Sequence, residues 1–183
     1  KLKEVSFGII VLGIGLIGML KTAIEIFENL KERENKAWSV ITLASSYYYK
    51  SELDSMHLCL IGAEKMAKEH QLNTDIFDAI YGLLGLYHYT TLEIEKAIFY
   101  NNRSLQLIEN KTEKNDVDSF QIANLYNNIG LNYIQHFNLQ RAEFCLSKSI
   151  GIFQALSVPI PESISIYNHY SDVLYRLEEY DKS

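Results

Sequence analysis

A short sequence pattern returns five times along this chain, and each copy opens a stretch with helical periodicity. The pattern is an apolar residue, two variable residues and then a residue that is generally small. It occurs at Leu20/Ala23, Leu53/Met56, Ile94/Ala97, Leu139/Ala142 and Tyr180/Ser183, at intervals of 33, 41, 45 and 41 residues. Self-similarity with such periods predicts a solenoid, because one unit is too small to bury its own apolar face and must stack on its neighbours.

A second set of positions extends the pattern backwards by twelve residues, to places where two helices must approach closely. These positions are Val11, Ala44, Gly85, Gly130 and Ser171. Bulky residues at spacings of three, four and seven around them form one helical face, and no sustained alternation predicts a strand. We therefore predict nine helices, at residues 4–17, 20–33, 36–50, 53–70, 74–89, 92–109, 117–136, 139–157 and 162–177.

The fold class that follows is an all-α, right-handed α-solenoid of stacked antiparallel helical hairpins. We expect residues 1–183 to form a single domain. Its repeats would lie at about 4–33, 36–70, 74–109 and 117–157, with a partial repeat at 162–183. The chain stops where a further helix should begin, so we expect it to be a fragment of a longer protein.

The composition permits a continuous core but gives no sign of an electrostatic partner. Of the 183 residues, 48% are hydrophobic, and the net charge is −6 with a pI near 5.4. An acidic chain without a lysine or arginine cluster has little affinity for nucleic acid or for an anionic lipid surface. We therefore expect neither nucleic acid nor membrane among the partners of this chain.

Two cysteines, Cys59 and Cys145, occupy equivalent places two repeats apart. Neighbouring helices pack about 8–10 Å apart, so these thiols would lie beyond the limit of roughly 7 Å for a disulfide. We expect two reduced thiols, which favours a cytoplasmic location.

The best-matched segments resemble tetratricopeptide repeats (TPRs). They are residues 125–134 (LYNNIGLNYI) with 138–150, residues 79–88 with 95–101, and residues 167–183. The resemblance implies stacked helical hairpins that bind a protein or a peptide. The intervals of 41 and 45 residues exceed the family's usual repeat length. Such lengthened repeats resemble those of bacterial signalling proteins, including regulators that read secreted peptides.

The amino-terminal segment leaves three interpretations open. Gly13, Gly15 and Gly18 fit the G-x-G-x-x-G pattern of dinucleotide-binding units, but no second strand ending in an acidic residue follows. Residues 5–20 are free of charge for 16 positions, which favours a membrane or signal segment yet falls short of the roughly 20 residues that span a bilayer. The third interpretation is an apolar first repeat whose glycines let helices pack closely.

The first helix of each hairpin would line a concave groove. By register its residues are Trp38, Thr42, Ser45, Tyr48, Tyr49, Tyr89, Asn124, Asn127, Asn128, Leu131, Asn168, His169, Asp172 and Tyr175. Asparagine amides can bond both groups of a peptide unit, and tyrosines supply flat contact area at low entropic cost. Tetratricopeptide domains that bind a terminal carboxylate use lysine or arginine in this groove, and here Arg176 is the lone candidate. We therefore expect the ligand to be bound through its peptide main chain.

No arrangement of residues predicts catalysis, a cofactor or a metal site. The five histidines are scattered without metal-ligand spacing, and His88 occupies a core position of its repeat. We expect a non-enzymatic protein- or peptide-binding module that serves as the sensory or scaffold part of a larger signalling protein. The alternatives are self-association as a homodimer through the apolar N-terminal helix, and an NAD(P)-binding enzyme fragment.

Overall fold

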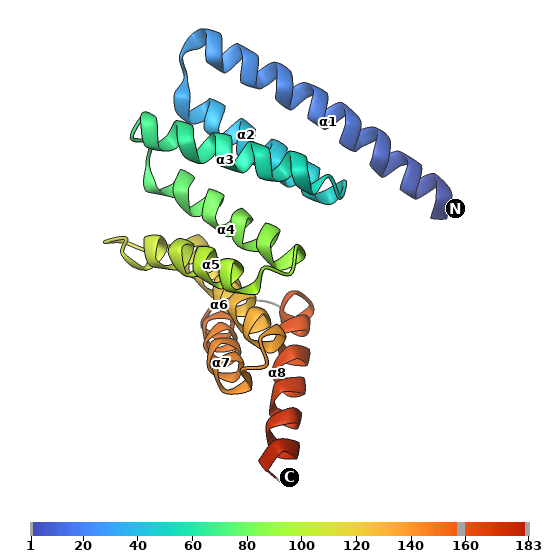
Figure 1. Cartoon of the computed structure of the whole chain (residues 1–183), viewed down its shortest axis with the longest axis vertical. Helices are drawn as coiled ribbons and strands as arrows, with labels where there is room; N and C mark the ends of the chain where they lie inside the picture. Colours follow the sequence, from blue (N-terminus) through green and yellow to red (C-terminus); the bar gives the residue numbers. More distant parts are fainter. Residues whose placement is uncertain (1, 157–159, 182–183) are drawn as a thin grey trace. The chain divides into compact units, whose positions relative to one another are not determined.

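The computed structural model describes residues 2–156 and 160–181, with side chains at residues 15–156 and 164–178. Eight α-helices and no strand occur in the described residues (Figure 1). The helices are α1 (Leu2–Leu30), α2 (Arg33–Tyr49), α3 (Leu53–Glu69), α4 (Thr74–Thr90), α5 (Ile94–Glu109), α6 (Asp116–Gln135), α7 (Leu139–Ala155) and α8 (Ile160–Asp181). The predicted all-α class is confirmed.

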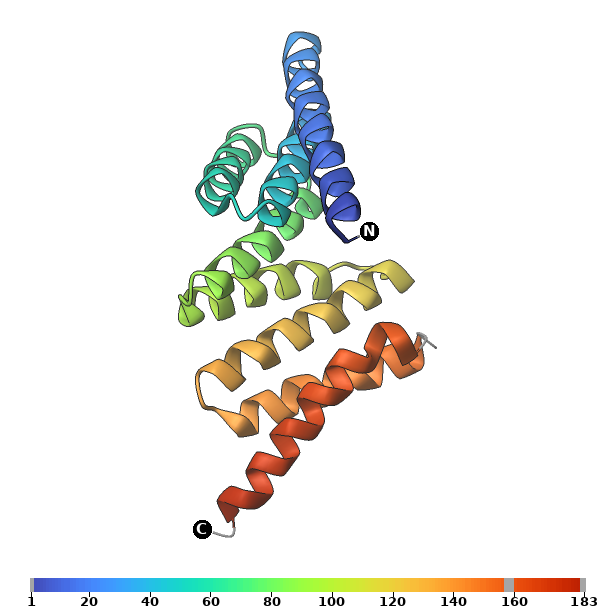
Figure 2. The same cartoon turned by 90° about the vertical axis from the view of Figure 1, so that its right-hand side faces the viewer.

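The helices gather into two compact units, which are described separately: residues 1–87 and residues 88–183. In the first unit, α2 packs against both α1 and α3. In the second, α6 packs between α5 and α7, while α8 packs on α7 and touches α6 (Figure 2). These consecutive helices therefore pack as neighbours, as a helical repeat requires. The assignment of the whole chain to one domain stays a prediction.

The helix break predicted between residues 17 and 20 is wrong. Helix α1 runs unbroken from Leu2 to Leu30, so the first hairpin, residues 4–33, does not form. No proline interrupts this stretch, and no glycine in the described residues has positive φ. A Cβ added at Gly15 or Gly18 would meet nothing within 4 Å, so these two glycines are not there to permit close packing. The pattern at Leu20/Ala23 lies in the middle of a helix.

Five of the turns between helices share one backbone geometry that uses no glycine. Each contains a residue with φ between 52° and 62°: Lys31, Ser51, Gln71, Leu92 and Phe137. The next residue donates its N–H to a carbonyl five positions back, as in Asn138 N to Tyr133 O at 2.9 Å. This is the Schellman pattern of hydrogen bonds, which ends a helix sharply. Glycine is its usual residue, so its absence hid the geometry of these turns, although the sequence predicted helix breaks close to all five.

We expect Phe137→Gly to raise the free energy of unfolding by about 0.5–1 kcal/mol, since an L-residue in the left-handed region is strained by about 1–2 kcal/mol and glycine is not. Little packing is lost, because 88% of the Phe137 surface is exposed. Urea unfolding followed by circular dichroism measures the change. Phe137→Ala is the control, since it removes the ring but keeps the Cβ. A glycine variant no more stable than the alanine variant would contradict this explanation.

The core of the second unit lies along α7. Ala142, Leu146, Ile150 and Phe153 are buried there with Ala123 of α6 and with Ile166 and Val173 of α8. The closest approach is at Gly130 of α6, whose missing Cβ leaves room for Leu146. Ser149 Oγ donates to Ala123 O at 2.7 Å, which satisfies a hydroxyl that is itself fully buried.

A capping box begins α6. Asn115 Oδ1 accepts from Asp118 N at 2.9 Å, and Asp118 Oδ2 accepts from Asn115 N at 3.1 Å. The other carboxylate oxygen of Asp118 accepts from Lys111 Nζ at 2.6 Å. The Asp118 side chain is 8% exposed, so this short loop is fixed to the helix by a nearly buried ion pair.

Candidate functional site

The asparagines predicted to line a groove lie on α6 and α8 of the second unit, and these two helices touch. On α6, Asn124, Asn127, Asn128 and Leu131 are all half-buried. On α8, Asn168, Asp172 and Tyr175 are exposed at spacings of four and three residues, which places them on one side of the helix. His169 is half-buried beside them. We call these eight residues the α6/α8 face.

Two polar atoms of the α6/α8 face are buried without a hydrogen-bond partner: Asn127 Oδ1 and His169 Nδ1. Leaving such an atom unpaired costs about 1–3 kcal/mol. A ligand reaches these atoms only after the side chains turn, because neither atom is open to solvent. Once reached, the amide oxygen accepts a hydrogen bond, and the imidazole nitrogen accepts or donates according to its tautomer.

The α6/α8 face has little capacity to grip a free carboxylate. Arg176 Nη2 lies 3.0 Å from Asp172 Oδ2 on the same helix, and both side chains are about half exposed, at 46% and 47%. An incoming carboxylate would have to displace Asp172 from this ion pair. Arg176, the lone candidate from the sequence for binding a terminal carboxylate, is thus paired with Asp172 in the structure.

The first unit presents a separate aromatic face on α2. Trp38, Thr42, Ser45 and Tyr49 recur at spacings of four, three and four residues, so they share one side of the helix. Trp38 is 39% exposed and Tyr49 is 85% exposed, with Tyr48 packed edge-on against Tyr49 at 5.6 Å. Thr42 Oγ1 donates to Trp38 O and Ser45 Oγ donates to Ile41 O, at 2.9 and 3.3 Å. The two hydroxyl groups have thus donated their protons and can offer a ligand chiefly a hydrogen-bond acceptor.

The last residue of the predicted groove is Tyr89, which is half-buried near the end of α4. The neighbouring His88 is buried, as the sequence predicted, with its ring stacked on Tyr100 at 5.2 Å. His88 Nδ1 lies 2.6 Å from Glu93 Oε2. Hydrogen bonds from Lys96 and then from His88 hold the pKa of the Glu93 carboxyl below its usual value. Glu93 thus anchors the turn between α4 and α5 and is not merely a solvated acid.

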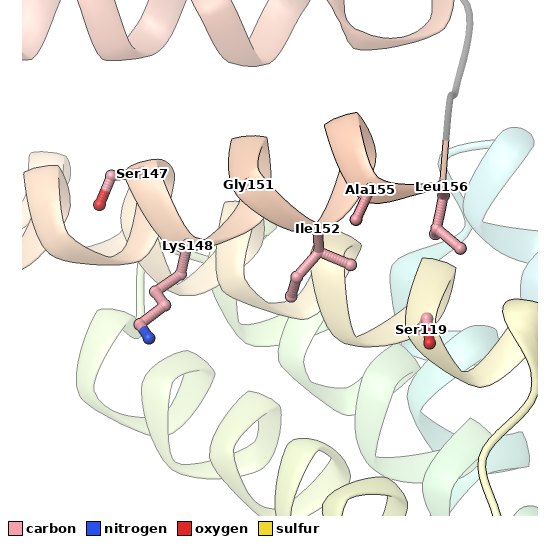
Figure 3. Close-up of a pocket in the computed structure, with 7 residues that line it drawn as sticks. All are labelled: Ser119, Ser147, Lys148, Gly151, Ile152, Ala155 and Leu156. Carbon is pink, nitrogen blue, oxygen red and sulfur yellow. The ribbon is translucent and has the colours of Figure 1, made fainter.

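The sequence analysis missed a hollow of about 450 Å³ between α6 and α7 (Figure 3). Its apolar lining includes Ile152, Ala155 and Leu156, and its polar groups are Ser119, Ser147 and Lys148. The Lys148 ammonium lies 5.7 Å from the centre of the Phe144 ring, within reach of a cation–π contact. Small residues at Ser147, Gly151 and Ala155, four apart on one side of α7, were the signal available in the sequence.

Neither cysteine thiol is an activated nucleophile. Cys59 and Cys145 are free thiols. Burial raises the pKa of the Cys145 thiol to about 11 and also raises that of Cys59. Both are therefore protonated at neutral pH, whereas a reactive cysteine needs a lowered pKa. No group of three His, Cys, Asp or Glu side chains suited to a metal occurs within residues 15–156 and 164–178.

The glycine pattern at residues 13–18 lacks the backbone of a dinucleotide site. Such a site needs a strand, a tight turn and then a helix, but Gly13, Gly15 and Gly18 all lie inside α1. The NAD(P)-binding interpretation is therefore wrong for this segment. Among the residues that were searched, which leave out the side chains before residue 15, no helix is long and apolar enough to cross a membrane.

Comparison with known proteins supports the fold. No protein-family model and no curated protein matches the sequence. The chain is similar to the crystal structure of BtubC (BKLC) from P. vanneervenii, with a TM-score of 0.71 and 18% identity over 92% of this chain and 68% of that one. A second match is the TPR2AB domain of yeast Sti1 in complex with pHSP90, with a TM-score of 0.38 and 11% identity over 92% and 86% of the two chains.

The likeness to BtubC shows an all-α, helical-repeat fold and nothing about function, because only 18% of the residues are identical. The likeness to Sti1 is too slight to carry an argument. The chain is thus an all-α helical-repeat protein, and its membership of the tetratricopeptide family stays a prediction.

Proposed function

We propose that this chain is a non-catalytic binding module that holds an extended peptide segment of a partner protein on the α6/α8 face. The observation that carries the proposal is the unpaired Asn127 amide oxygen on α6. Helix α6 touches α8, which exposes Asn168 and Tyr175. A second unpaired atom, His169 Nδ1, lies on α8. Folded proteins pair nearly all buried polar groups, so two unpaired atoms on adjoining helices favour a ligand that satisfies them.

The chemistry of the α6/α8 face suits a main chain more than a charged terminus. A peptide unit offers one N–H and one C=O, which match the acceptor and donors of an asparagine amide. Tyr175, which is 64% exposed, adds flat contact area. The aromatic face on α2 has the same character and supports the same kind of ligand. The resemblance of the lengthened repeats to those of bacterial signalling proteins supports a place in a larger protein of that kind, as its sensory or scaffold part. The two free thiols favour a cytoplasmic location.

Peptide selection followed by calorimetry tests the proposal. Random linear peptides displayed on phage are selected on the immobilised chain, and a selected peptide is titrated into wild-type, Asn127→Ala and Asn168→Ala proteins. Each substitution should weaken binding about two- to tenfold, since one hydrogen bond contributes roughly 0.5–1.5 kcal/mol. Asn127→Ala should also raise the melting temperature of the free protein, because it removes an unpaired buried oxygen.

Asn102→Ala is the matched control. Asn102 lies exposed on α5, outside the α6/α8 face, and its Nδ2 donates to Ile98 O at 2.8 Å. Its replacement should leave the affinity unchanged. If selected peptides bind Asn127→Ala and Asn168→Ala as tightly as the wild type, the α6/α8 face is not the peptide site.

A further inference from the structure

The hollow between α6 and α7 has a lining that suits one kind of small molecule. Its volume of about 450 Å³ lies within the range of roughly 300–1,000 Å³ that is usual for ligand pockets. Figure 3 shows Lys148 at one end and Leu156 at the other, with Ile152 between them. Along α7 these ends are about 12 Å apart, at 1.5 Å per residue. The hollow is therefore elongated, with a cationic end and an apolar end.

The Lys148 ammonium at the cationic end is available to an anion. Lysines of α3 are paired along their own helix, as in Lys68 with Glu64 at 2.7 Å, four residues apart. The residues four positions before and after Lys148 are Phe144 and Ile152, which offer no carboxylate. The ammonium lies 5.7 Å from the centre of the Phe144 ring and has no ion-pair partner among the described side chains. A cation–π contact at this distance holds the charge beside the hollow without neutralising it.

The rest of the lining favours an alkyl chain next to that charge. Ile152, Ala155 and Leu156 supply apolar surface, and none of the lining residues that the structure describes is acidic. A peptide main chain would bring N–H groups that need acceptors, and in this lining only the hydroxyls of Ser119 and Ser147 could supply them. The lining therefore fits an apolar molecule with one anionic end better than it fits a peptide.

We propose that this hollow binds a small amphipathic carboxylate of the medium-chain fatty-acid class. Its carboxylate would pair with Lys148, and its alkyl chain would lie over Ile152 toward Leu156. One ammonium balances one negative charge, which a carboxylate provides. A phosphate monoester would add a second negative charge to a chain whose net charge is already −6, so it is the less favourable ligand.

Gly151 keeps the hollow open, and the hollow is separate from the α6/α8 face. Gly151 lies on the exposed side of α7, and a Cβ there would meet nothing within 4 Å. Leu146 and Ile150 of α7 are the residues buried in the core with α8. A larger side chain at Gly151 would therefore fill the hollow without disturbing that core.

Isothermal titration calorimetry with decanoate, kept below the concentration at which it forms micelles, tests the proposal on the full chain. The wild type should bind one molecule per chain. Lys148→Gln should weaken binding about tenfold, the lower end of what a hydrogen bond to a charged group contributes. Lys148→Arg keeps the charge and should stay within about twofold of the wild type. Decanol, which lacks the charge, should bind more weakly than decanoate and should not respond to Lys148→Gln.

Gly151→Leu should weaken the binding of decanoate at least about tenfold, because the leucine side chain would displace about two buried CH₂ groups or more. Its melting temperature should stay the same or rise, since leucine is a better helix former than glycine. Gly62→Leu is the matched control, because Gly62 is an exposed glycine of α3 where a Cβ also meets nothing within 4 Å. Asn127→Ala is a second control, on the α6/α8 face. Both controls should leave the affinity for decanoate unchanged.

Failure of decanoate to bind the wild type would overturn the proposal. The same holds if Lys148→Gln and Gly151→Leu bind decanoate as tightly as the wild type, or if the controls weaken binding as much as they do. A wild type that sediments with phosphatidylglycerol vesicles but binds no free decanoate would also overturn it, because the hollow would then serve a lipid surface.

Discussion

Replacing Gly130 with valine lowers the free energy of unfolding of the second unit by about 2–3 kcal/mol, the range expected of an overpacked core. A Cβ at Gly130 would lie 2.8 Å from Leu146 Cγ and 2.9 Å from Leu146 Cδ2. Leu146 is fully buried between α6 and α8 neighbours, so it has no free volume into which to move. Urea unfolding monitored by circular dichroism measures the loss.

The same substitution elsewhere isolates the steric cause. Gly151 also lies within a helix, but it is exposed and a Cβ there would meet nothing within 4 Å. Gly151→Val should therefore leave stability unchanged or raise it by a few tenths of a kcal/mol, since glycine is a poorer helix former than valine.

A double-mutant cycle tests whether Leu146 is the residue that clashes. Leu146→Ala alone should cost about 3 kcal/mol, as expected for a leucine truncated in a core. In the double variant with Gly130→Val, the loss of unfolding free energy should be smaller than the sum of the two single losses by about 1–2 kcal/mol. The valine would fill part of the cavity left by Leu146→Ala, and the shorter side chain would remove the clash with the valine. Additive losses would show that Gly130 is needed for some reason other than contact with Leu146.

The close approach at Gly130 was predictable because two helices that pack closely need a small residue on each of them. The sequence analysis paired Gly130 with the position twelve residues on, Ala142, and both lie in the α6–α7 contact. The same argument placed α2 to α8 within a few residues of their observed bounds. It failed for α1, because the pattern at Leu20/Ala23 is also satisfied by an uninterrupted helix that has apolar residues on two sides.

The α6/α8 face was predictable only as a set of positions on two helices. Register grouped Asn168, Asp172 and Tyr175, and the structure exposes all three on one side of α8. The sequence could not show that the Asn127 amide oxygen is unpaired or that Asp172 forms an ion pair with Arg176, because both depend on side-chain torsions. For the hollow beside Lys148 the sequence offered only the small residues spaced four apart on α7, which do not show that Ser119 of α6 lies across from them.

Asp118→Asn should destabilise the second unit by about 2 kcal/mol at neutral pH, since a hydrogen bond to a charged group contributes roughly 1.5–3 kcal/mol. Asparagine keeps the shape of the side chain and an acceptor for Asn115 N, but it loses the charge that binds Lys111 at 2.6 Å. Asp116→Asn is the control, because Asp116 is an exposed acid in the same first turn. Its replacement should cost about 0.5 kcal/mol or less.

The loss at Asp118 should also depend on pH in one direction. The Lys111 ammonium, and then the Asn115 backbone N–H, hold the pKa of the Asp118 carboxyl below its usual value of 3.8. A carboxyl whose folded-state pKa is lowered contributes its full stability above the unfolded-state pKa and loses it as the pH falls through the folded-state pKa. The wild type should therefore exceed Asp118→Asn by a constant amount above about pH 5, and the difference should shrink below about pH 4. A difference that persists unchanged at the lowest pH would mean that the carboxylate charge is not what fixes this loop, since only the ionised form of Asp118 can bind the ammonium of Lys111 as an ion pair.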